Sequence, residues 1–177
     1  MDGQFYVDSK EPFPVTSGPT ITLTTNNQFL AGPNMLPLFP PNYFNYIGKM
    51  VRWRWVGQCT SGATPGTLAF DVEWGPATNA TGTIITGVNF GWAANQANAT
   101  WLFEGFARCR SLGSSGSLFA GGWLYFQSTG IFVVQPTSPA AVTCDLTQSY
   151  YIIPQCNRSG STAETIQLHD AFYEAVN

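Results

Sequence analysis

Two stretches of the chain alternate strictly between apolar and polar side chains. They are residues 50–57 (Met-Val-Arg-Trp-Arg-Trp-Val-Gly) and residues 66–74 (Gly-Thr-Leu-Ala-Phe-Asp-Val-Glu-Trp). Successive side chains of a β-strand point to opposite faces, so a period of two predicts strands with one buried face. All the aromatic residues of both stretches fall on one face, with Val51 and Val72, and the charged residues fall on the other.

The charged faces of these two stretches complement each other. If the stretches pair as a hairpin, one register sets Arg54 opposite Asp71 and Arg52 opposite Glu73. The same register also matches the apolar faces, and a sheet fixes its pairing where both faces agree. The pattern therefore predicts a cross-strand salt ladder of these four residues.

The middle of the chain predicts six strands separated by turns rich in Gly, Pro, Ser and Thr. The predicted strands are residues 49–58, 66–74, 82–90, 100–110, 117–127 and 131–135. No helical period lies between them, which indicates an all-β fold, a jelly-roll-like antiparallel β-sandwich. We divide the chain into an extended Pro/aromatic-rich N-terminal arm, residues 1–47, and a β-sandwich (jelly-roll) domain, residues 48–177.

The predicted hairpin around Ser114 has two contrasting faces. If Cys109 is paired with Leu118, Ala107 lies opposite Ala120 and Gly105 lies opposite Gly122. On this face the small residues form a groove, and we expect it to receive Trp53 and Trp55 from the facing sheet.

The opposite face of this hairpin is too apolar to be left to water. Large apolar surface patches mark interfaces, so we predict a subunit contact here. The candidate interface residues are Leu102, Phe106, Phe119, Trp123 and Tyr125. The alternative is that the N-terminal arm of the same chain covers this face.

The N-terminal arm interleaves proline with aromatic and aliphatic residues. Proline removes backbone donors and fixes φ, which excludes helix and central strand here, apart from a short strand in residues 20–25. The apolar side chains must still dock, either on the chain's own sandwich or on a neighbour. The candidates for capsid or neighbour contact are Phe29, Leu36, Leu38, Phe39, Tyr43 and Phe44.

The composition excludes several classes of partner. Only 10% of residues are charged and the net charge is −3, so no basic patch is expected to bind nucleic acid. No apolar run is long enough to span a membrane, and the N-terminus lacks a signal-peptide pattern, so we expect a protein made in the cytoplasm. Four cysteines without paired spacing argue against zinc, and free thiols are the expectation, with a Cys144–Cys156 pair left open.

Candidate catalytic groups are few, and each has a simpler structural explanation. Asp71 and Glu73 have the spacing of a glycosidase pair, but predicted arginine partners make them a salt ladder. His169 and Asp170 are adjacent in a strand and point to opposite faces, so the aspartate does not orient the histidine. We therefore expect no enzyme activity, no cofactor and no metal.

Several motifs resemble a group of tailed-phage virion proteins. They are Trp53-Arg-Trp-Val-Gly57, Thr64-Pro-Gly-Thr-Leu68, the 101–118 strand pair split by a Gly-Ser-Ser-Gly turn, and the 161–175 segment Ser-Thr-Ala-Glu-Thr-Ile-Gln-Leu-His-Asp-Ala-Phe-Tyr-Glu-Ala. The resemblance covers about residues 48–176. It implies a jelly-roll domain on the virion, often a trimeric capsid decoration or minor head protein. It also implies that the C-terminal segment, whose pattern alone fits helix or strand, is a strand with a bulge near Asp170.

These expectations describe a structural virion protein, assembled in the bacterial host cytoplasm. Its expected partners are copies of itself, as a homotrimer, and the major capsid protein or other virion proteins. The alternative is a carbohydrate-binding or tail-associated jelly-roll module, which requires exposed aromatics such as Trp92 or Trp101. A hydrolase using Asp71 and Glu73 is the remaining option.

Overall fold

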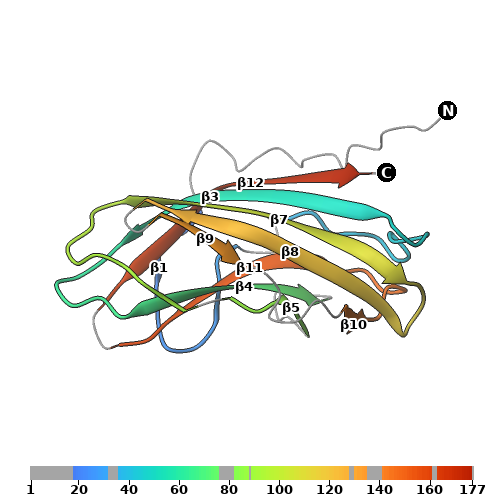
Figure 1. Ribbon diagram of the computed structural model, residues 1–177, viewed down its shortest axis with the longest axis horizontal. Coiled ribbons are helices and arrows are strands. Elements are labelled where there is room, and N and C mark those ends of the chain that lie inside the picture. Colours follow the sequence, from blue (N-terminus) through green and yellow to red (C-terminus); the bar gives the residue numbers. More distant parts are fainter. Residues whose placement is uncertain are drawn as a thin grey trace.

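The computed structural model confirms the all-β prediction. It describes residues 18–31, 36–75, 82–87, 89–127, 130–134, 141–160 and 163–176, the backbone alone being described for 130–134. Within these residues the secondary structure is entirely β (Figure 1). The strands are β1 (Ile21–Thr22), β2 (Gln28–Phe29), β3 (Met50–Thr60), β4 (Thr67–Gly75), β5 (Gly82–Ile85), β6 (Phe90–Gly91), β7 (Ala99–Ser111), β8 (Gly116–Phe126), β9 (Gly130–Val134), β10 (Val142–Cys144), β11 (Tyr151–Arg158) and β12 (Thr165–Val176).

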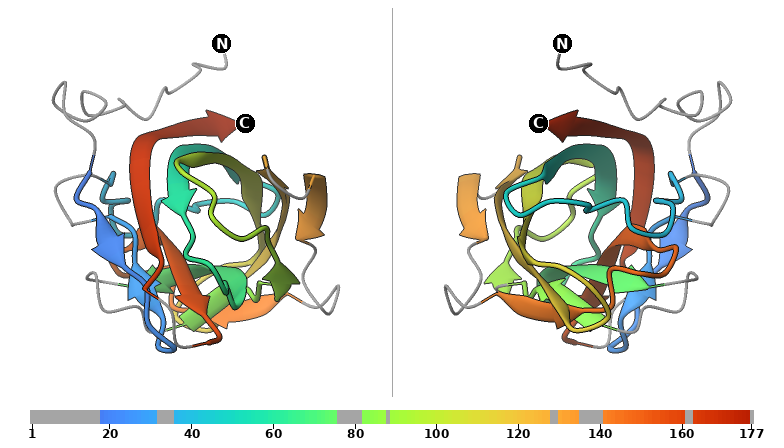
Figure 2. Two further views of the ribbon diagram at one scale, coloured as in Figure 1. Left: turned by 90° about the vertical axis from the view of Figure 1, so that its left-hand side faces the viewer. Right: turned by 90° about the vertical axis from the view of Figure 1, so that its right-hand side faces the viewer.

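Two antiparallel sheets pack face to face. The seven-stranded sheet has the order β1-β12-β3-β7-β8-β10, with β9 also paired to β8. The five-stranded sheet has the order β2-β11-β4-β5, with β6 also paired to β4. Seen along the long axis, the two sheets curl around a common core (Figure 2).

Strands near the two ends of the sequence pair with each other, and strands closer to its middle pair within them. β1 pairs with β12, β2 with β11, β3 with β7 and β4 with β5, so that β1 to β4 alternate between the two sheets. This is the connectivity of a jelly roll, with β8, β9 and β10 added beyond β7 at one side of the larger sheet. The predicted fold class is therefore confirmed.

The predicted hairpin between residues 50–57 and 66–74 is wrong. β3 lies between β12 and β7 in the larger sheet, whereas β4 lies between β11 and β5 in the smaller one. The predicted inward faces of both strands do point into the core, where they meet across the sandwich instead of lying side by side, but the charged face of β4 is buried as well. A local pattern fixes the face of a strand and leaves its neighbour open.

The predicted strand 82–90 is two short strands, because it pairs with β4 at two separate places. β5 pairs with Val72–Trp74, and β6 pairs with Thr67–Leu68. Between them the backbone N–H of Gly87 donates to Asp71 Oδ1 at 2.6 Å. A Cβ at Gly87 would lie 1.9 Å from the Phe70 carbonyl oxygen, so the close approach requires glycine.

The hairpin of β7 and β8 has the predicted register. Cys109 pairs with Leu118, and Gly105 pairs with Gly122. The tryptophan expected from the facing sheet comes instead from the neighbouring strand, because Trp53 is the direct partner of Gly105 within the same sheet. A Cβ at Gly105 would lie 2.6 Å from the Trp53 ring, so the small residue makes room for the indole.

β12 resolves the ambiguity of the C-terminal segment. It is a strand of 12 residues, with a register shift between Leu168 and Asp170. The shift moves the buried side chains from even positions, such as Ile166, to odd positions, such as Tyr173. The predicted strand and its bulge are confirmed.

Two of the motifs meet at one end of the sandwich. Gly66 of the Thr-Pro-Gly-Thr motif donates its N–H to Glu164 Oε1 at 2.8 Å, and the Thr67 N–H donates to Ser159 Oγ at 2.9 Å. Glu164 is fully buried, and its other oxygen has no hydrogen-bond partner within the described residues. The contact ties the β3–β4 connection to the start of β12.

Candidate functional site

Among the residues that the structure describes, the outer face of the seven-stranded sheet carries three of the four exposed aromatic side chains, Trp123, Tyr125 and Phe172. Its side chains form rows across the strands, because cross-strand partners point to the same side of a sheet. One row joins Phe172 on β12, Arg54 on β3, Glu104 on β7 and Trp123 on β8 as successive direct partners. We call these four residues the Arg54 row.

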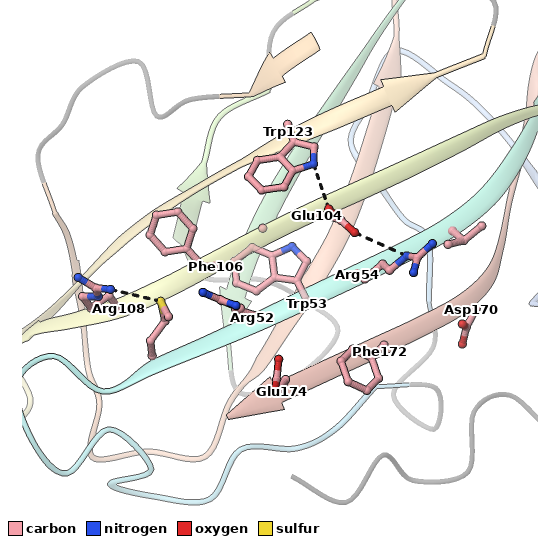
Figure 3. A pocket seen from close by; sticks show the side chains of 13 residues that line it. Arg52, Trp53, Arg54, Glu104, Phe106, Arg108, Trp123, Asp170, Phe172 and Glu174 are labelled. Atoms are coloured by element: carbon pink, nitrogen blue, oxygen red, sulfur yellow. Dashed lines mark hydrogen bonds and ion pairs between the residues drawn. The ribbon is translucent and has the colours of Figure 1, made fainter. Parts of the chain in front are cut away.

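The Arg54 row is held by polar contacts between neighbours. The Trp123 indole N–H donates to Glu104 Oε2 at 3.1 Å, and Arg54 Nε lies 3.7 Å from Glu104 Oε1 (Figure 3). The carboxylate thus connects the indole to the guanidinium. Trp123 is 49% exposed and Phe172 is 44% exposed, so an aromatic ring faces solvent at each end of the row.

The β7–β8 side of this face is the apolar strip, Leu102, Phe106, Phe119, Trp123 and Tyr125. The sequence proposed these five residues as a subunit interface, and the structure places them together on one surface. Tyr125 is 39% exposed, and Leu102, Phe106 and Phe119 are half-buried. The Phe106 and Phe119 rings lie 6.0 Å apart between centroids. Whether another subunit covers the strip stays a prediction.

The β12–β3–β7 side of the same face is hollowed into a groove of about 870 Å³. Six of its 13 lining residues are charged, whereas the whole chain has only 17 charged residues among 177. We call it the charged groove. Its charged side chains are Arg52, Arg54, Arg108, Glu104, Asp170 and Glu174, and its aromatic walls are Phe106, Trp123 and Phe172 (Figure 3).

One end of the charged groove is basic. Arg108 Nη2 lies 3.7 Å from Met50 Sδ, and Arg52 is the cross-strand partner of Phe106. Arg110, just beyond, lies over the Phe119 ring at 5.0 Å from its centroid, a cation–π contact. Glu174 is the cross-strand partner of Arg52 and brings an opposite charge to this end.

The predicted salt ladder is wrong, because its residues lie in different sheets. Arg52 and Arg54 point outward from β3, whereas Asp71 and Glu73 are buried on β4. Asp71 accepts from the Gly87 N–H, and Glu73 Oε1 accepts from the Thr83 hydroxyl at 2.6 Å. Burial raises the pKa of Glu73, and the nearby Asp71 charge raises it further, while the Thr83 hydrogen bond opposes both.

The arm residues that the structure describes belong to the protein's own core. Leu36, Phe39 and Phe44 are buried, so the prediction that they contact the capsid or a neighbour is corrected. Phe29 and Tyr43 pack against the same core. The physical reason is that the described part of the arm adds β1 and β2 to the two sheets, and the residues after β2 then return to the core, where Phe39 forms a bridge with Tyr150.

Leu38 is the one neighbour-contact candidate that remains at the surface, with 47% of its area exposed. The next residue, Phe39, turns inward and stacks on Tyr150 with 5.5 Å between ring centroids. The backbones of these two residues also exchange hydrogen bonds, at 2.8 Å and 3.1 Å. Residues 1–17, which the sequence also assigned to the arm, lie outside the described residues.

The other candidate groups do not assemble into a site. Trp92 and Trp101 are buried, which corrects the expectation that they are available to sugars. The four cysteines are buried free thiols. Among the residues that the structure describes, no cluster of three His, Cys, Asp or Glu side chains could hold a metal ion, and no helix could cross a membrane. His169 is half-buried on β12.

Comparisons with known proteins leave the family open. No protein-family model matches the chain, and no curated protein matches it. Among solved structures, Trypanosoma rangeli sialidase in complex with 2,3-difluorosialic acid aligns with 94% of this chain at 13% identity and a TM-score of 0.31. The aligned part is 27% of the sialidase chain, and so weak an overlap carries no conclusion about activity.

Sequence reasoning missed the β12 wall of the charged groove. Asp170, Phe172 and Glu174 alternate with inward residues after the bulge, and this alternation was the available signal. It was obscured because the segment also fits a helix. Glu104 was not predicted as a site residue, because its contact with Arg54 depends on β3 lying beside β7.

Proposed function

We propose that this chain is a structural protein of a tailed-phage virion, a homotrimeric capsid decoration protein that acts by adhesion and carries out no reaction. The observation that carries the proposal is the apolar strip on the outer face of a jelly-roll sheet. Trp123 and Tyr125 stay exposed there although the core behind them is complete. Jelly rolls serve in many viral capsids, and exposed aromatic clusters mark protein interfaces.

The composition of the strip supports a protein partner. Interfaces are enriched in Trp, Tyr, Phe and Arg, and here aromatic residues lie beside Arg108 and Arg110. Burying such a strip contributes about 25 cal/mol for each Å² of apolar area, before the cost of association is subtracted. Symmetric repetition of such a contact would hold the subunits together and would add avidity on a capsid lattice.

The environment of the reactive groups supports a non-enzymatic role. Asp71 and Glu73 are buried and already accept hydrogen bonds, so they are not arranged as an exposed acid and base. Burial raises the pKa of all four cysteine thiols, which disfavours the thiolate that a nucleophile needs.

Two experiments test the proposal. Size-exclusion chromatography with light scattering should give a trimer, and Tyr125→Lys with Leu102→Lys should give a monomer. Leu112→Lys is the matched control, because Leu112 is an exposed apolar residue outside the strip. A wild-type monomer at micromolar concentration would contradict the self-association.

Attachment to the virion needs a separate measurement. Electron cryomicroscopy of phage particles, with this protein labelled, should show it on the capsid with Leu102, Phe119 and Tyr125 of the apolar strip covered. Its absence from the particle, or an uncovered strip, would overturn the assignment.

A further inference from the structure

The charged groove has as many hydrogen-bond-donating guanidinium groups as hydrogen-bond-accepting carboxylates, three of each. Arg52, Arg54 and Arg108 are donor-only groups, whereas the carboxylates of Glu104, Asp170 and Glu174 are acceptor-only when ionised. Within the residues that the structure describes, Arg54 and Glu104 form the one ion pair. Most of this hydrogen-bonding capacity is therefore satisfied by solvent and is open to a ligand.

We infer that the charged groove is a binding site for a neutral oligosaccharide of hexopyranose units, with one sugar ring stacked on Trp123. The inference goes beyond the proposed function and does not rest on it. A hydroxyl group both donates and accepts a hydrogen bond. A polyhydroxylated ligand therefore matches a lining in which guanidinium and carboxylate groups lie side by side, as Arg54 and Glu104 do.

The stacking platform is fixed before any ligand arrives. The Trp123 N–H is bound to Glu104, which holds the indole in one orientation while almost half of the residue stays exposed. Both residues lie on long central strands, which position side chains better than loops do. The C–H groups on one face of a pyranose ring can then pack on the electron-rich face of the indole.

The balance of charge selects against other ligand classes. Three arginines and three carboxylates line the groove, so the lining as a whole carries no net charge to attract an anionic ligand. A purely apolar surface pressed into the groove would strip water from six charged groups and leave most of them without partners, which is costly. A neutral hydroxylated ligand replaces the water hydrogen bonds and avoids both problems. The groove volume lies within the usual range for small-molecule sites.

The ligand test uses soluble neutral hexasaccharides as probes: cellohexaose, maltohexaose, mannohexaose and chitohexaose. Trp123 is the one exposed tryptophan of the six in the chain, so its fluorescence should report binding while the buried five contribute a constant signal. At least one probe should shift this fluorescence saturably, with a matching heat in titration calorimetry. If none of the four binds at millimolar concentration, the inference is overturned.

Variants then locate the site. Trp123→Ala and Glu104→Gln should each weaken binding about tenfold or more, because each removes a ligand contact and Glu104→Gln replaces an acceptor-only group. Tyr46→Ala is the matched control: it removes an exposed aromatic that lies outside both the groove and the apolar strip, and binding should be unchanged. Equal binding by Glu104→Gln and wild type, or binding only of a sulfated sugar such as heparin hexasaccharide, would overturn the assignment.

The outcomes also separate this inference from the proposed function. The double change of Tyr125 and Leu102 to lysine tests assembly and leaves the groove lining intact, whereas Glu104→Gln tests the groove and leaves the apolar strip intact. Because Trp123 belongs to both the strip and the groove, sugar binding is also measured on this double variant, and a monomeric double variant that binds no sugar rejects only the present inference. A sugar-binding monomer rejects only the self-association.

Discussion

The indole of Trp101 on β7 packs against Gly57, its direct cross-strand partner on β3. A Cβ added at Gly57 would lie 2.5 Å from the Trp101 ring and 2.1 Å from the Gln167 carbonyl oxygen. The same relationship joins Trp53 to Gly105 and Trp74 to Gly82. Glycine opposite tryptophan is therefore how this core accommodates large rings within a continuous sheet.

Gly57→Ala should destabilise the protein because the new methyl group meets both a ring and a backbone atom. We expect the free energy of unfolding to fall by about 1–3 kcal/mol, the usual cost of overpacking a core. Chemical denaturation with urea measures it. Gly91→Ala is the control, since a Cβ there meets open space, and the change should stay within about 0.5 kcal/mol. Equal effects of the two substitutions would contradict the packing argument.

Tyr173→Phe should destabilise the sandwich by breaking a hydrogen-bond chain between the sheets. The Trp55 indole N–H donates to the Tyr173 oxygen at 3.0 Å, and the Tyr173 hydroxyl donates to the Ile152 carbonyl at 2.8 Å. Losing the hydroxyl leaves a buried donor and a buried acceptor unpaired, at a cost of about 1–3 kcal/mol. Tyr125→Phe changes an exposed tyrosine, and its unfolding midpoint should match that of the wild type.

Stability should increase as the pH falls from neutrality towards 4.5, the ordinary glutamate pKa. Burial raises the pKa of Glu73, and burial also raises that of Glu164 against the opposing effects of the Gly66 N–H and Arg158. Between 4.5 and these raised values the folded protein binds more protons than the unfolded chain, so each carboxylate destabilises the fold progressively as pH rises through that window.

Unfolding curves between pH 7.5 and pH 4.5 check this sign, and Glu73→Gln or Glu164→Gln should flatten the dependence. Asp145 acts in the opposite sense, because the Thr147 hydroxyl and N–H lower its pKa from 3.8 and its stabilising contribution is lost only below that value. Unfolding free energy that falls steadily from neutral pH to pH 5 would show the carboxylate assignment to be wrong.

The four thiols should be unreactive in the folded protein. All are buried, and burial raises the pKa of Cys144 to about 12 and that of Cys59 and Cys156 well above the usual value. Ellman's reagent at pH 8 should therefore detect almost no thiol in the native protein and four after unfolding in guanidinium. Rapid reaction of a native thiol, or fewer than four in the unfolded chain, would contradict this expectation.

Much of the fold could be predicted where its cause is local. The alternation in residues 50–57 and 66–74 gave the correct strands and their inward faces, although the charged face of β4 proved to be buried too, and turn residues gave the correct register of the β7–β8 hairpin. The apolar strip followed from that hairpin alone, because its residues lie on two strands joined by a short turn. Its five members were therefore found without knowledge of any third strand.

The charged groove could not be predicted, because its walls come from three strands that are distant in sequence. Arg54 meets Glu104 only since β3 lies beside β7, and it meets Phe172 only since β12 closes the other side. Asp71 is closer to Arg54 in the sequence than Glu104 is, and the hairpin predicted from the Arg54–Asp71 pair was wrong. Charge complementarity is too weak at a solvated surface to choose a strand's partner.

By itself the sequence determined the strands whose side chains alternate and which side of each is apolar, since a period of two is a property of neighbouring residues, but it did not predict β2, β10 or β11. Tertiary structure alone decided which strands are neighbours, and so which side chains share a surface. That choice depends on burying both apolar faces around one core, to which the arm residues Leu36, Phe39 and Phe44 contribute. The free energy gained by burying apolar area depends on the whole molecule, so no local segment determines which strands are neighbours.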